Sequence, residues 1–252
     1  QVTATPSIAE PPSAGTGSNN DPYEIASIEN LFWIFMNPHR WDMSFAQTTD
    51  LDLSDTVNWF EGKGWPRIGN SSVHFSGTYD GQGHTISNLY INRPESSDVG
   101  LFGALNNATI RDLELVDFQV TGFNNTGGLA GSVFQTDIIE CQVSGIVTGT
   151  ANYAGGLTGQ SWESRIIGSS AHGEVNSNGN FIGGLVGFNR NALIDRCYTL
   201  SEVTGNGKVG GLAGWNYLSQ VIDSFSRSTV TGEESVGGLV GWNFNAEVTN
   251  SY

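Results

Sequence analysis

Two pairs of acidic side chains recur at matching positions of neighbouring segments and could do acid–base chemistry. Asp112 and Glu140 form one pair, Glu174 and Glu202 the other, and the same sequence interval separates the members of each pair. If such segments stack as adjacent strands, each pair lies about 5 Å apart at the backbone, near the carboxyl spacing of retaining glycosidases. Hydrolysis also needs a substrate groove and an acid with a raised pKa. Since no sequence pattern supplies either, we prefer solvated acids on an exposed wall, or a loose cation site.

The other residues that could do chemistry are scattered. A polysaccharide lyase would need an Arg or Lys base beside calcium-binding acids, but the ten basic residues share no column. The four histidines lack zinc-ligand spacing, and the Asp-Gly-Gln-Gly-His stretch ending at His84 has no nucleophile beside it. Asp50, Asp52 or Asp80 could ligate calcium, although no EF-hand pattern occurs. We therefore expect no catalytic residue, no metal and no cofactor.

Aromatic residues recur in two columns that could form a binding surface. One column stands three residues after a recurring leucine, and the other thirteen residues after it. Outward-facing rings at this spacing could stack on sugar rings or on another protein. Alternatively, the rings brace a turn, helped by an asparagine after each member of the first column, because stacked asparagines stabilise such coils. The columns are Phe188, Trp215 and Trp242, and Tyr198, Phe225 and Tyr252, and the asparagines are Asn189, Asn216 and Asn243.

A repeat determines the elements that must position these residues. A Gly-Gly-Leu-x-Gly element or a close variant occurs six times, and the spacing of its leucines is nearly constant. An isoleucine or valine follows nine residues after each leucine, and a valine column follows later in the unit. A period of roughly 20 to 50 residues indicates stacked supersecondary units. The leucines are Leu101, Leu129, Leu157, Leu185, Leu212 and Leu239.

Each unit contains three short apolar stretches that are separated by Gly, Asn and Ser, with no helical period between them. This pattern excludes a solenoid of alternating strands and helices. The period is also too short for a propeller blade, which needs about 40 residues. We therefore predict an all-β fold, a right-handed parallel β-helix with three short strands per coil and one coil per repeat.

The two cysteines test this register. Cys141 and Cys197 occupy the same position two units apart, which places them about 9.6 Å apart in stacked coils. A disulfide needs Cα atoms within roughly 7 Å of each other. We therefore expect two buried free thiols that fill space, equivalent to the serines between them.

The chain divides into three parts. Residues 1–21 are rich in Pro, Ser, Ala, Gly and Thr and are expected to form a flexible linker or arm. Residues 22–95 are predicted to be an N-terminal cap with the first coils, including a short α-helix that Ser27 caps. Residues 96–252 are the repeats, and the last coil is incomplete. We expect further chain or another molecule to cover that end, since uncovered coils could associate end to end.

The composition restricts partners and location. The 25 acidic and 10 basic residues give a net charge of −15, which disfavours binding to nucleic acid or anionic membrane surfaces. No apolar run approaches the about 18 residues of a membrane span, so no membrane insertion is expected. The chain begins at Gln1 without an apolar leader, which fits a mature secreted protein. Three sequons make Asn70, Asn107 and Asn124 candidate N-glycosylation sites.

The repeated element, followed by Ile and then by Cys-Tyr or Ser-Phe, resembles the GLUG motif repeats of bacterial and archaeal surface proteins. Residues 50–53 and 75–86 resemble the N-terminal cap usually found before such repeats, so the resemblance covers residues 22–252. It implies kinship with adhesin-like, biofilm and cell-wall proteins, and with non-catalytic parts of secreted peptidases and glycan-active enzymes. It supplies no catalytic signature.

These observations together predict a non-catalytic extracellular or cell-surface module of adhesive, matrix-forming or filament-forming character. Its partner would be a surface glycan, a surface protein, or further copies of itself. The alternative is a secreted β-helix, a glycoside hydrolase or polysaccharide lyase among the enzymes, that binds or cleaves glycans through the aromatic columns.

Overall fold

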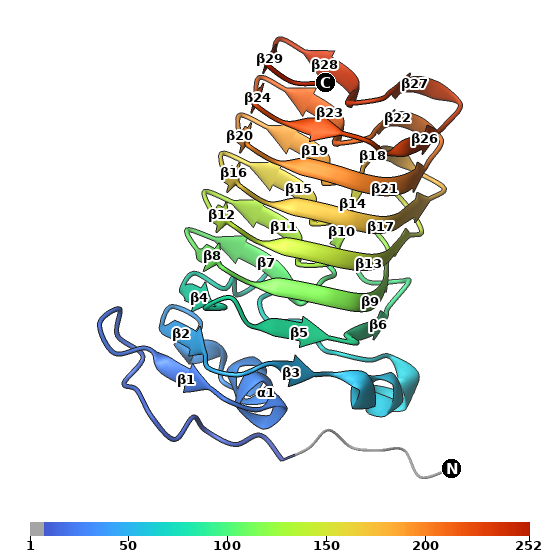
Figure 1. Cartoon of the computed structure of the whole chain (residues 1–252). Helices are drawn as coiled ribbons and strands as arrows, with labels where there is room; N and C mark the ends of the chain where they lie inside the picture. The colour runs from blue at the N-terminus through green and yellow to red at the C-terminus, as the bar shows by residue number, and fades with distance from the viewer. Residues whose placement is uncertain (1–7) are drawn as a thin grey trace.

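The computed structural model describes residues 8–252, and the chain winds into a right-handed parallel β-helix (Figure 1). Each strand pairs in parallel with the corresponding strand of the next coil, so four sheets run along the axis. We number them sheet 1 to sheet 4 in the order in which one coil passes through them. The predicted fold class is thereby confirmed.

Within the repeats, sheets 1 and 2 contain the strands that follow the recurring leucine, and sheet 2 also includes three strands of the N-terminal part. Sheet 1 consists of β7 (Phe102–Asn106), β11 (Ala130–Phe134), β15 (Thr158–Trp162), β19 (Val186–Arg190), β23 (Ala213–Tyr217) and β28 (Val240–Phe244). Sheet 2 consists of β1 (Tyr23–Ile25), β2 (Ser44–Gln47), β4 (Thr78–Asp80), β8 (Thr109–Arg111), β12 (Asp137–Ile139), β16 (Arg165–Ile167), β20 (Leu193–Asp195), β24 (Gln220–Ile222) and β29 (Glu247–Thr249).

Sheets 3 and 4 complete each coil. Sheet 3 consists of β3 (Leu51–Asp52), β5 (Thr85–Ser87), β9 (Glu114–Gly122), β13 (Gln142–Gly149), β17 (Ser170–Ser177), β21 (Tyr198–Thr204) and β25 (Phe225–Ser226), with β6 (Tyr90–Asn92) beside β9 and β26 (Thr229–Thr231) beside β21. Sheet 4 consists of β10 (Thr126–Gly127), β14 (Ala154–Gly155), β18 (Asn180–Gly183), β22 (Gly207–Gly210) and β27 (Glu234–Gly237).

The strands of sheet 4 give each coil a fourth strand, whereas the sequence predicts three strands per coil. Its strands have only two to four residues and end at the first glycine of the repeated element. They are recognised by backbone pairing, as between Gly127 and Gly155, and not by apolar side chains. Segments this short and rich in glycine carry no alternation of apolar and polar residues, so the sequence pattern does not reveal them.

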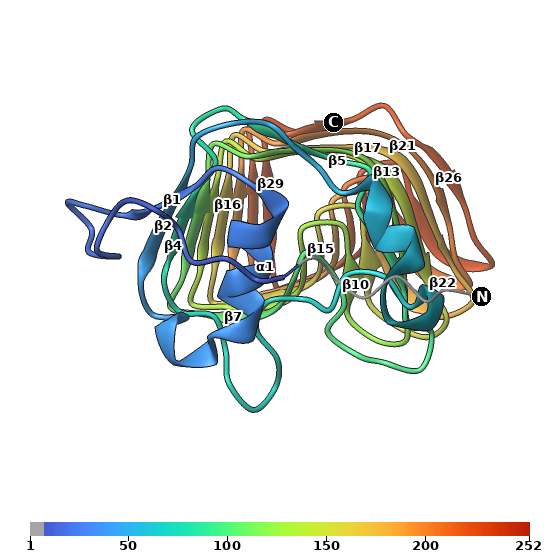
Figure 2. The same ribbon diagram turned by 90° about the horizontal axis from the view of Figure 1, so that it is seen from below.

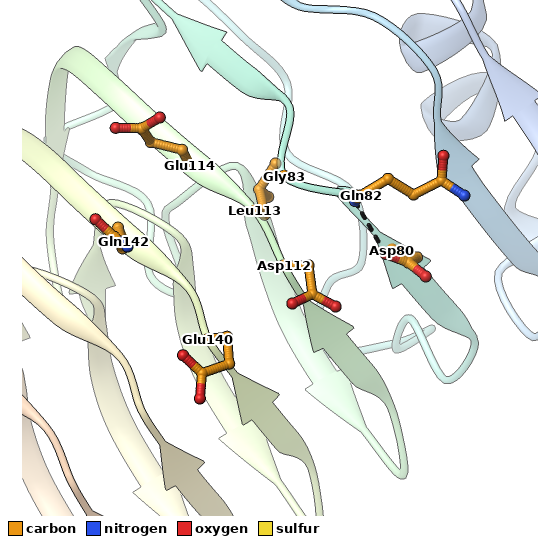
Figure 3. Close-up of a pocket in the computed structure, with 8 residues that line it drawn as sticks. All are labelled: Asp80, Gln82, Gly83, Asp112, Leu113, Glu114, Glu140 and Gln142. Atoms are coloured by element: carbon orange, nitrogen blue, oxygen red, sulfur yellow. Dashed lines mark hydrogen bonds between the residues drawn. The ribbon is translucent and has the colours of Figure 1, made fainter.

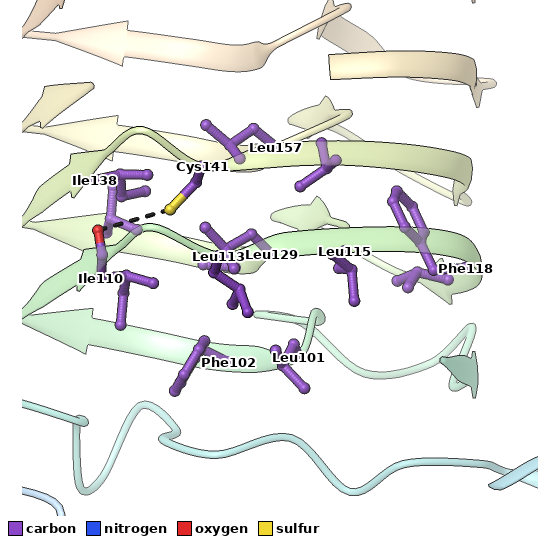
Figure 4. Close-up of a cluster of buried hydrophobic side chains, with 14 of the residues drawn as sticks. Leu101, Phe102, Ile110, Leu113, Leu115, Phe118, Leu129, Ile138, Cys141 and Leu157 are labelled. Carbon is purple, nitrogen blue, oxygen red and sulfur yellow. Dashed lines mark hydrogen bonds between the residues drawn. The ribbon is translucent and has the colours of Figure 1, made fainter. Parts of the chain in front are cut away.

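The recurring leucines form the inner column that the repeat predicts. All except Leu239 are completely buried, and Leu239 is partly buried against the same core. The backbone N–H of Leu129 donates to the carbonyl oxygen of Leu157 at 3.0 Å, and Leu157 donates in the same way to Leu185. Figure 4 shows Leu101, Leu129 and Leu157 stacked above one another. Each coil therefore adds one layer to a continuous apolar core.

The last glycine of the repeated element lets two walls approach closely. A Cβ atom on Gly159 would lie 2.5 Å from the backbone carbon of Asn125, which precedes the corner of the previous coil. A Cβ atom on Gly214 would lie 2.4 Å from the backbone nitrogen of Ile182 in the corresponding position. Only glycine fits where backbone meets backbone at such distances. The element therefore encodes a tight corner between sheets 4 and 1.

An N-terminal cap covers one end of the β-helix. The helix α1 (Ile28–Met36) lies across that end (Figure 2), and the Ser27 side chain caps it by accepting the backbone N–H of Asn30 at 3.2 Å. Two 3-10 segments, Pro38–Arg40 and the kinked Ser54–Gly62, complete the cap. The ring of Phe32 meets that of Trp59 edge to face at 5.2 Å. The apolar face of α1 thus covers the strands that the first coils would leave unpaired.

The predicted linker at residues 1–21 falls only partly within the described residues. Residues 1–7 lie outside them, whereas the backbone of the following segment hydrogen-bonds to the cap, Glu10 N–H to the Glu29 oxygen and Glu24 N–H to the Ala14 oxygen. Across residues 8–252, none of the helices has the length and apolar character that a membrane crossing requires.

Candidate functional surfaces

The first predicted aromatic column lies on the outer side of sheet 1. The ring centroids of Phe188 and Trp215 are 4.7 Å apart, and those of Trp215 and Trp242 are 5.1 Å apart, with interplanar angles of 22° and 10°. These rings therefore stack face to face along the helix axis. Phe188 is only 8% exposed and Trp242 39%. The ring faces that a sugar would need are largely used by neighbouring rings, which favours the bracing interpretation.

A second layer of side chains covers this column, and sequence reasoning missed it. Phe181 stacks on Trp215 with centroids 5.2 Å apart, Tyr153 stacks on Phe181 at 5.0 Å, and the Lys208 ammonium lies 4.9 Å from the centre of Trp242. All three occur four residues before a recurring leucine, and all three have positive φ angles, from 55° to 68°. Their regular spacing before the leucines could have revealed this layer. The sequence does not show their left-handed backbone conformation, which turns the three side chains toward sheet 1.

The asparagines of the column point into the core instead of outward. Asn189 and Asn216 are completely buried. The Nδ2 atom of Asn189 donates to Oδ1 of Asn216 at 2.9 Å, and Nδ2 of Asn216 donates to Oδ1 of Asn243 at 2.8 Å. A buried amide must have such a partner, and a neighbour one coil away supplies it. This is the stabilising ladder that the alternative interpretation predicts.

The second predicted aromatic column lies on the outer side of sheet 3. The rings of Tyr198 and Phe225 stack at 5.2 Å and 10°, and those of Phe225 and Tyr252 at 5.7 Å and 14°. His172 meets Tyr198 edge to face at 5.5 Å. The two predicted columns are therefore on different sheets and do not form one surface. A ligand-binding role for either column remains a prediction.

A third column, also missed from the sequence, runs beside the first on sheet 1. It stands five residues after the recurring leucine and contains an arginine between aromatic residues. The guanidinium carbon of Arg190 lies 4.5 Å from the ring centre of Trp162 and 5.7 Å from that of Tyr217. The column consists of Phe134, Trp162, Arg190, Tyr217 and Phe244. Its members are of four different residue types, so a search for one recurring residue type does not reveal the column.

The first carboxylate pair lines an open depression beside sheets 2 and 3 (Figure 3). Asp112 and Glu140 are both exposed and follow the paired residues Arg111 and Ile139. Arg111 donates to the carboxylate of Asp80 at 2.6 Å and lies 4.0 Å from that of Asp112. The cluster is therefore partly neutralised and open to water, unlike the enclosed site that a general acid needs.

The second carboxylate pair lies side by side on the outer face of sheet 3. Glu174 and Glu202 are register partners in β17 and β21, and both are exposed. The Oε2 atom of Glu174 accepts a hydrogen bond from Asn176 at 3.4 Å. The predicted pairing in adjacent coils is therefore confirmed, and the surroundings match the solvated wall that we preferred.

The aspartates considered for calcium are occupied by donors from the protein. Asp50 accepts the backbone N–H of Thr85 at 2.9 Å and lies 3.2 Å from the His84 ring nitrogen. These two contacts, the first more than the second, hold the pKa of Asp50 below its usual value. The Asp52 carboxylate accepts a hydrogen bond from the side-chain amide of Asn88 at 2.9 Å. Within residues 8–252, no three His, Cys, Asp or Glu residues come together as a metal site would require.

Both cysteines are free and buried, as the register predicts. The Ser169 side chain lies between them in the same column, with its oxygen 3.1 Å from the backbone nitrogen of Cys141. Burial raises the pKa of both thiols to about 12. Since the thiolate is the reactive form, burial disfavours reactivity at Cys141 and Cys197, and their structural role stays a prediction.

The three sequons differ in accessibility. Asn107 is exposed at a turn, where its Nδ2 donates only to Asn106. Asn70 and Asn124 are half-buried, and their Oδ1 atoms accept backbone N–H groups, from Ser72 and Asn152 respectively. Glycosylation at these sites remains a prediction, and Asn107 is the best placed of the three.

Fold and repeat together define a solenoid protein of the parallel β-helix class. A family model described as the GLUG motif matches residues 232–252. The sequence is 38% identical to halomucin from Haloquadratum walsbyi over 141 residues, which is 54% of this chain and 2% of halomucin. It is 31% identical over 110 residues to a Gly-rich membrane protein of Evansella cellulosilytica, covering 43% of this chain and 12% of that protein. The chain thus contains a match to the GLUG motif at residues 232–252, and it spans only a small part of these relatives.

Two solved structures share the fold. One is a protein from Bacteroides ovatus described as a candidate immunoglobulin A1 protease, with a TM-score of 0.70 and 19% identity over 94% of this chain and 76% of that protein. The other is an IgA1 protease, with a TM-score of 0.63 and 19% identity over 90% of this chain and 20% of the protease. At this identity the likeness concerns the β-helix and not a shared activity.

Proposed function

We propose that this chain is a non-catalytic structural module of a protein displayed outside the cell. The observation that carries the proposal is the continuous bonding between coils. Four sheets join each coil to the next from β7 onward, and a buried asparagine ladder and stacked aromatic columns add side-chain contacts in the same direction. Such an arrangement resists separation of the coils along the axis, which suits a rigid spacer.

Two further observations support this proposal. The relatives include halomucin and a Gly-rich membrane protein, whose names fit a surface location. The acidic groups at matching positions of adjacent coils, Asp112 with Glu140 and Glu174 with Glu202, are exposed on open walls. An adhesive or matrix role would then depend on what the module carries or binds.

Location is tested on intact cells of the source organism. Antibodies raised against residues 22–252 are expected to label intact cells as strongly as permeabilised cells, and brief treatment of intact cells with a protease should remove the label. An antibody to a cytosolic enzyme is the control and should label only permeabilised cells. Labelling that requires permeabilisation would contradict the proposal.

The absence of catalysis is tested separately. The purified chain is expected to release no products from plant, bacterial and host polysaccharides or from immunoglobulin A1, which the names of the structural neighbours make a necessary substrate to try. Reproducible turnover that Glu174→Gln or Asp112→Asn abolishes would show that the module is an enzyme.

A further inference from the structure

Two cations are held by aromatic rings at the outer face of sheet 1, Arg190 from β19 of this sheet and Lys208 from β22 of sheet 4. The Arg190 guanidinium lies between Trp162 and Tyr217, and its Nε atom is buried with no hydrogen-bond partner among residues 8–252. The Lys208 ammonium lies 5.1 Å from the ring centre of Phe181 and 4.9 Å from that of Trp242. Cations above ring faces are attracted by the ring quadrupole, so the rings fix both positions.

Three arginines have acidic partners, whereas these two cations, like Arg40, Arg67, Arg93 and Arg227, form no ion pair within residues 8–252. The three paired arginines, Arg111, Arg165 and Arg196, each approach an aspartate to 2.6 Å. The chain carries 25 acidic residues and a net charge of −15. The outward positions of the sheet 1 strands carry no acid, although the exposed Glu163 directly follows Trp162 and donates its backbone N–H to the Arg190 carbonyl oxygen at 3.0 Å.

We propose that this face binds a carboxylated polysaccharide, a linear glycan in which uronic acid residues occur. The terminal nitrogens of Arg190 and the ammonium of Lys208 bind carboxylates, since charge-assisted hydrogen bonds of this kind are strong and Arg matches the carboxylate geometry. Arg190 and Phe244 cover part of the faces of Trp162 and Tyr217, so only the exposed parts of these two rings contact the apolar C–H surfaces of the sugar rings.

The charge and the layout of the surface favour this class of ligand over other polyanions. A nucleic acid has one charge per nucleotide and needs a continuous basic groove. Two cations on a chain of net charge −15 cannot provide that groove, and the remaining surface repels dense negative charge. The aromatic positions recur once per coil, at about 4.8 Å along the axis, which suits a linear ligand with a ring in every unit.

The test is to measure binding to defined polymers by calorimetry and by affinity electrophoresis. The chain is expected to bind hyaluronate, in which only every second sugar carries a carboxylate, to bind neutral dextran at least tenfold more weakly, and to lose affinity as salt rises. The double variant Arg190→Gln, Lys208→Gln should reduce binding about tenfold or more, as loss of a charged contact typically does. Trp162→Ala should weaken binding as well.

Matched controls separate this site from general charge effects. Arg165→Gln removes the same charge from sheet 2, where Arg165 is paired with Asp137, and should leave binding unchanged. Arg190→Lys retains the charge and should retain part of the affinity. Thermal unfolding of each variant shows whether it is folded. The proposal is overturned if no carboxylated polymer binds, if Arg165→Gln is as damaging as the double variant, or if polyglutamate or single-stranded DNA binds equally well.

Discussion

The side-chain oxygen of Ser169 accepts the backbone N–H of Cys141 at 3.1 Å, across the boundary between two coils. The Ser169 hydroxyl in turn donates to the carbonyl oxygen of Ile167 at 3.1 Å. The same arrangement joins Ser224 to Cys197 at 3.0 Å. At the turn between sheets 2 and 3, each hydroxyl thus satisfies a buried N–H group that the parallel ladder leaves without a carbonyl partner.

This relationship predicts the cost of removing one hydroxyl. Ser169→Ala leaves the buried N–H of Cys141 without an acceptor and should lower the free energy of unfolding by about 1–2 kcal/mol. Denaturant titration monitored by tryptophan fluorescence measures the change. Ser144→Ala is the matched control, since Ser144 lies half-buried on the outer side of sheet 3. Equal stability of the two variants would show that the hydroxyl contributes nothing.

The thiol of Cys197 stands at the column position that Ser169 and Ser224 fill with hydroxyls, and its Sγ donates to the carbonyl oxygen of Asp195 at 3.3 Å. Sulfur accepts hydrogen bonds weakly, so Cys197→Ser should hold or raise the melting temperature by completing the column of hydroxyls. Cys197→Val has a similar size but no acceptor, and we expect it to lower the melting temperature. Differential scanning calorimetry of both variants decides the matter, and the reverse order would be inconsistent with this role.

The asparagine ladder provides a second measure of contacts between coils. Asn216→Leu deprives the Asn189 amide of its buried partner and should reduce the free energy of unfolding by about 1–3 kcal/mol. Asn176→Leu is the control, because Asn176 points outward from sheet 3 with only a 3.4 Å hydrogen bond to Glu174. Equilibrium unfolding in urea compares the two. A ladder without energetic value would give the same midpoint for both variants.

The glycine at the tight corner is expected to be intolerant of any side chain. Gly159→Ala places a methyl group 2.5 Å from the backbone of Asn125, and the backbone must shift, at a cost of about 1–3 kcal/mol. Gly238→Ala tests a glycine of the same repeated element, whose added methyl group meets nothing within 4 Å. Thermal unfolding should therefore distinguish the two. A tolerated Gly159→Ala would mean that the walls can move apart freely.

The carboxylates of the cap predict how stability responds to acid. The side chain of Asn88 and then the N–H of Ser54 hold the pKa of Asp52 below its usual value of 3.8. A carboxyl whose folded pKa is depressed stabilises the fold above its unfolded pKa, and this contribution is lost as the pH falls through the folded pKa. The melting temperature should therefore fall below about pH 4, and by less in Asp52→Asn. Asp55→Asn, which removes a charge without removing these contacts, should retain the steep fall.

Much of the fold could be predicted because one repeat determines it. The spacing of Leu129, Leu157 and Leu185 gives the coil length, and the matching isoleucines identify sheet 2. Sheet 4 could not be predicted, since its strands depend on backbone pairing between residues such as Gly127 and Gly155. The helix α1 was recognisable from Ser27 and the apolar residues that follow it.

The surface was less predictable than the core. The columns containing Trp215 and Tyr198 were visible because their residue types repeat, but the stacking of one ring on another, which covers most ring faces, depends on three-dimensional detail. Arg190 and Lys208 seemed scattered in the sequence, because their aromatic neighbours come from other coils or from the far side of a corner. The spacing of residues in the sequence reveals which of them align in one column. It does not reveal which outward-facing side chains of different columns contact one another.

The turn from sheet 3 to sheet 4 differs in length between coils, and this difference has an evolutionary consequence. Asn176 pairs with Thr204, and Asn180 pairs with Gly207. The turn between these pairs therefore has three residues in one coil, 177–179, and two in the next, 205–206. The longer and the shorter coils thus differ at this turn, while the glycine corner and the inner leucines keep their register. Insertions and deletions should accumulate at this turn among related proteins, and it is the natural place to graft a foreign loop without disturbing the stack.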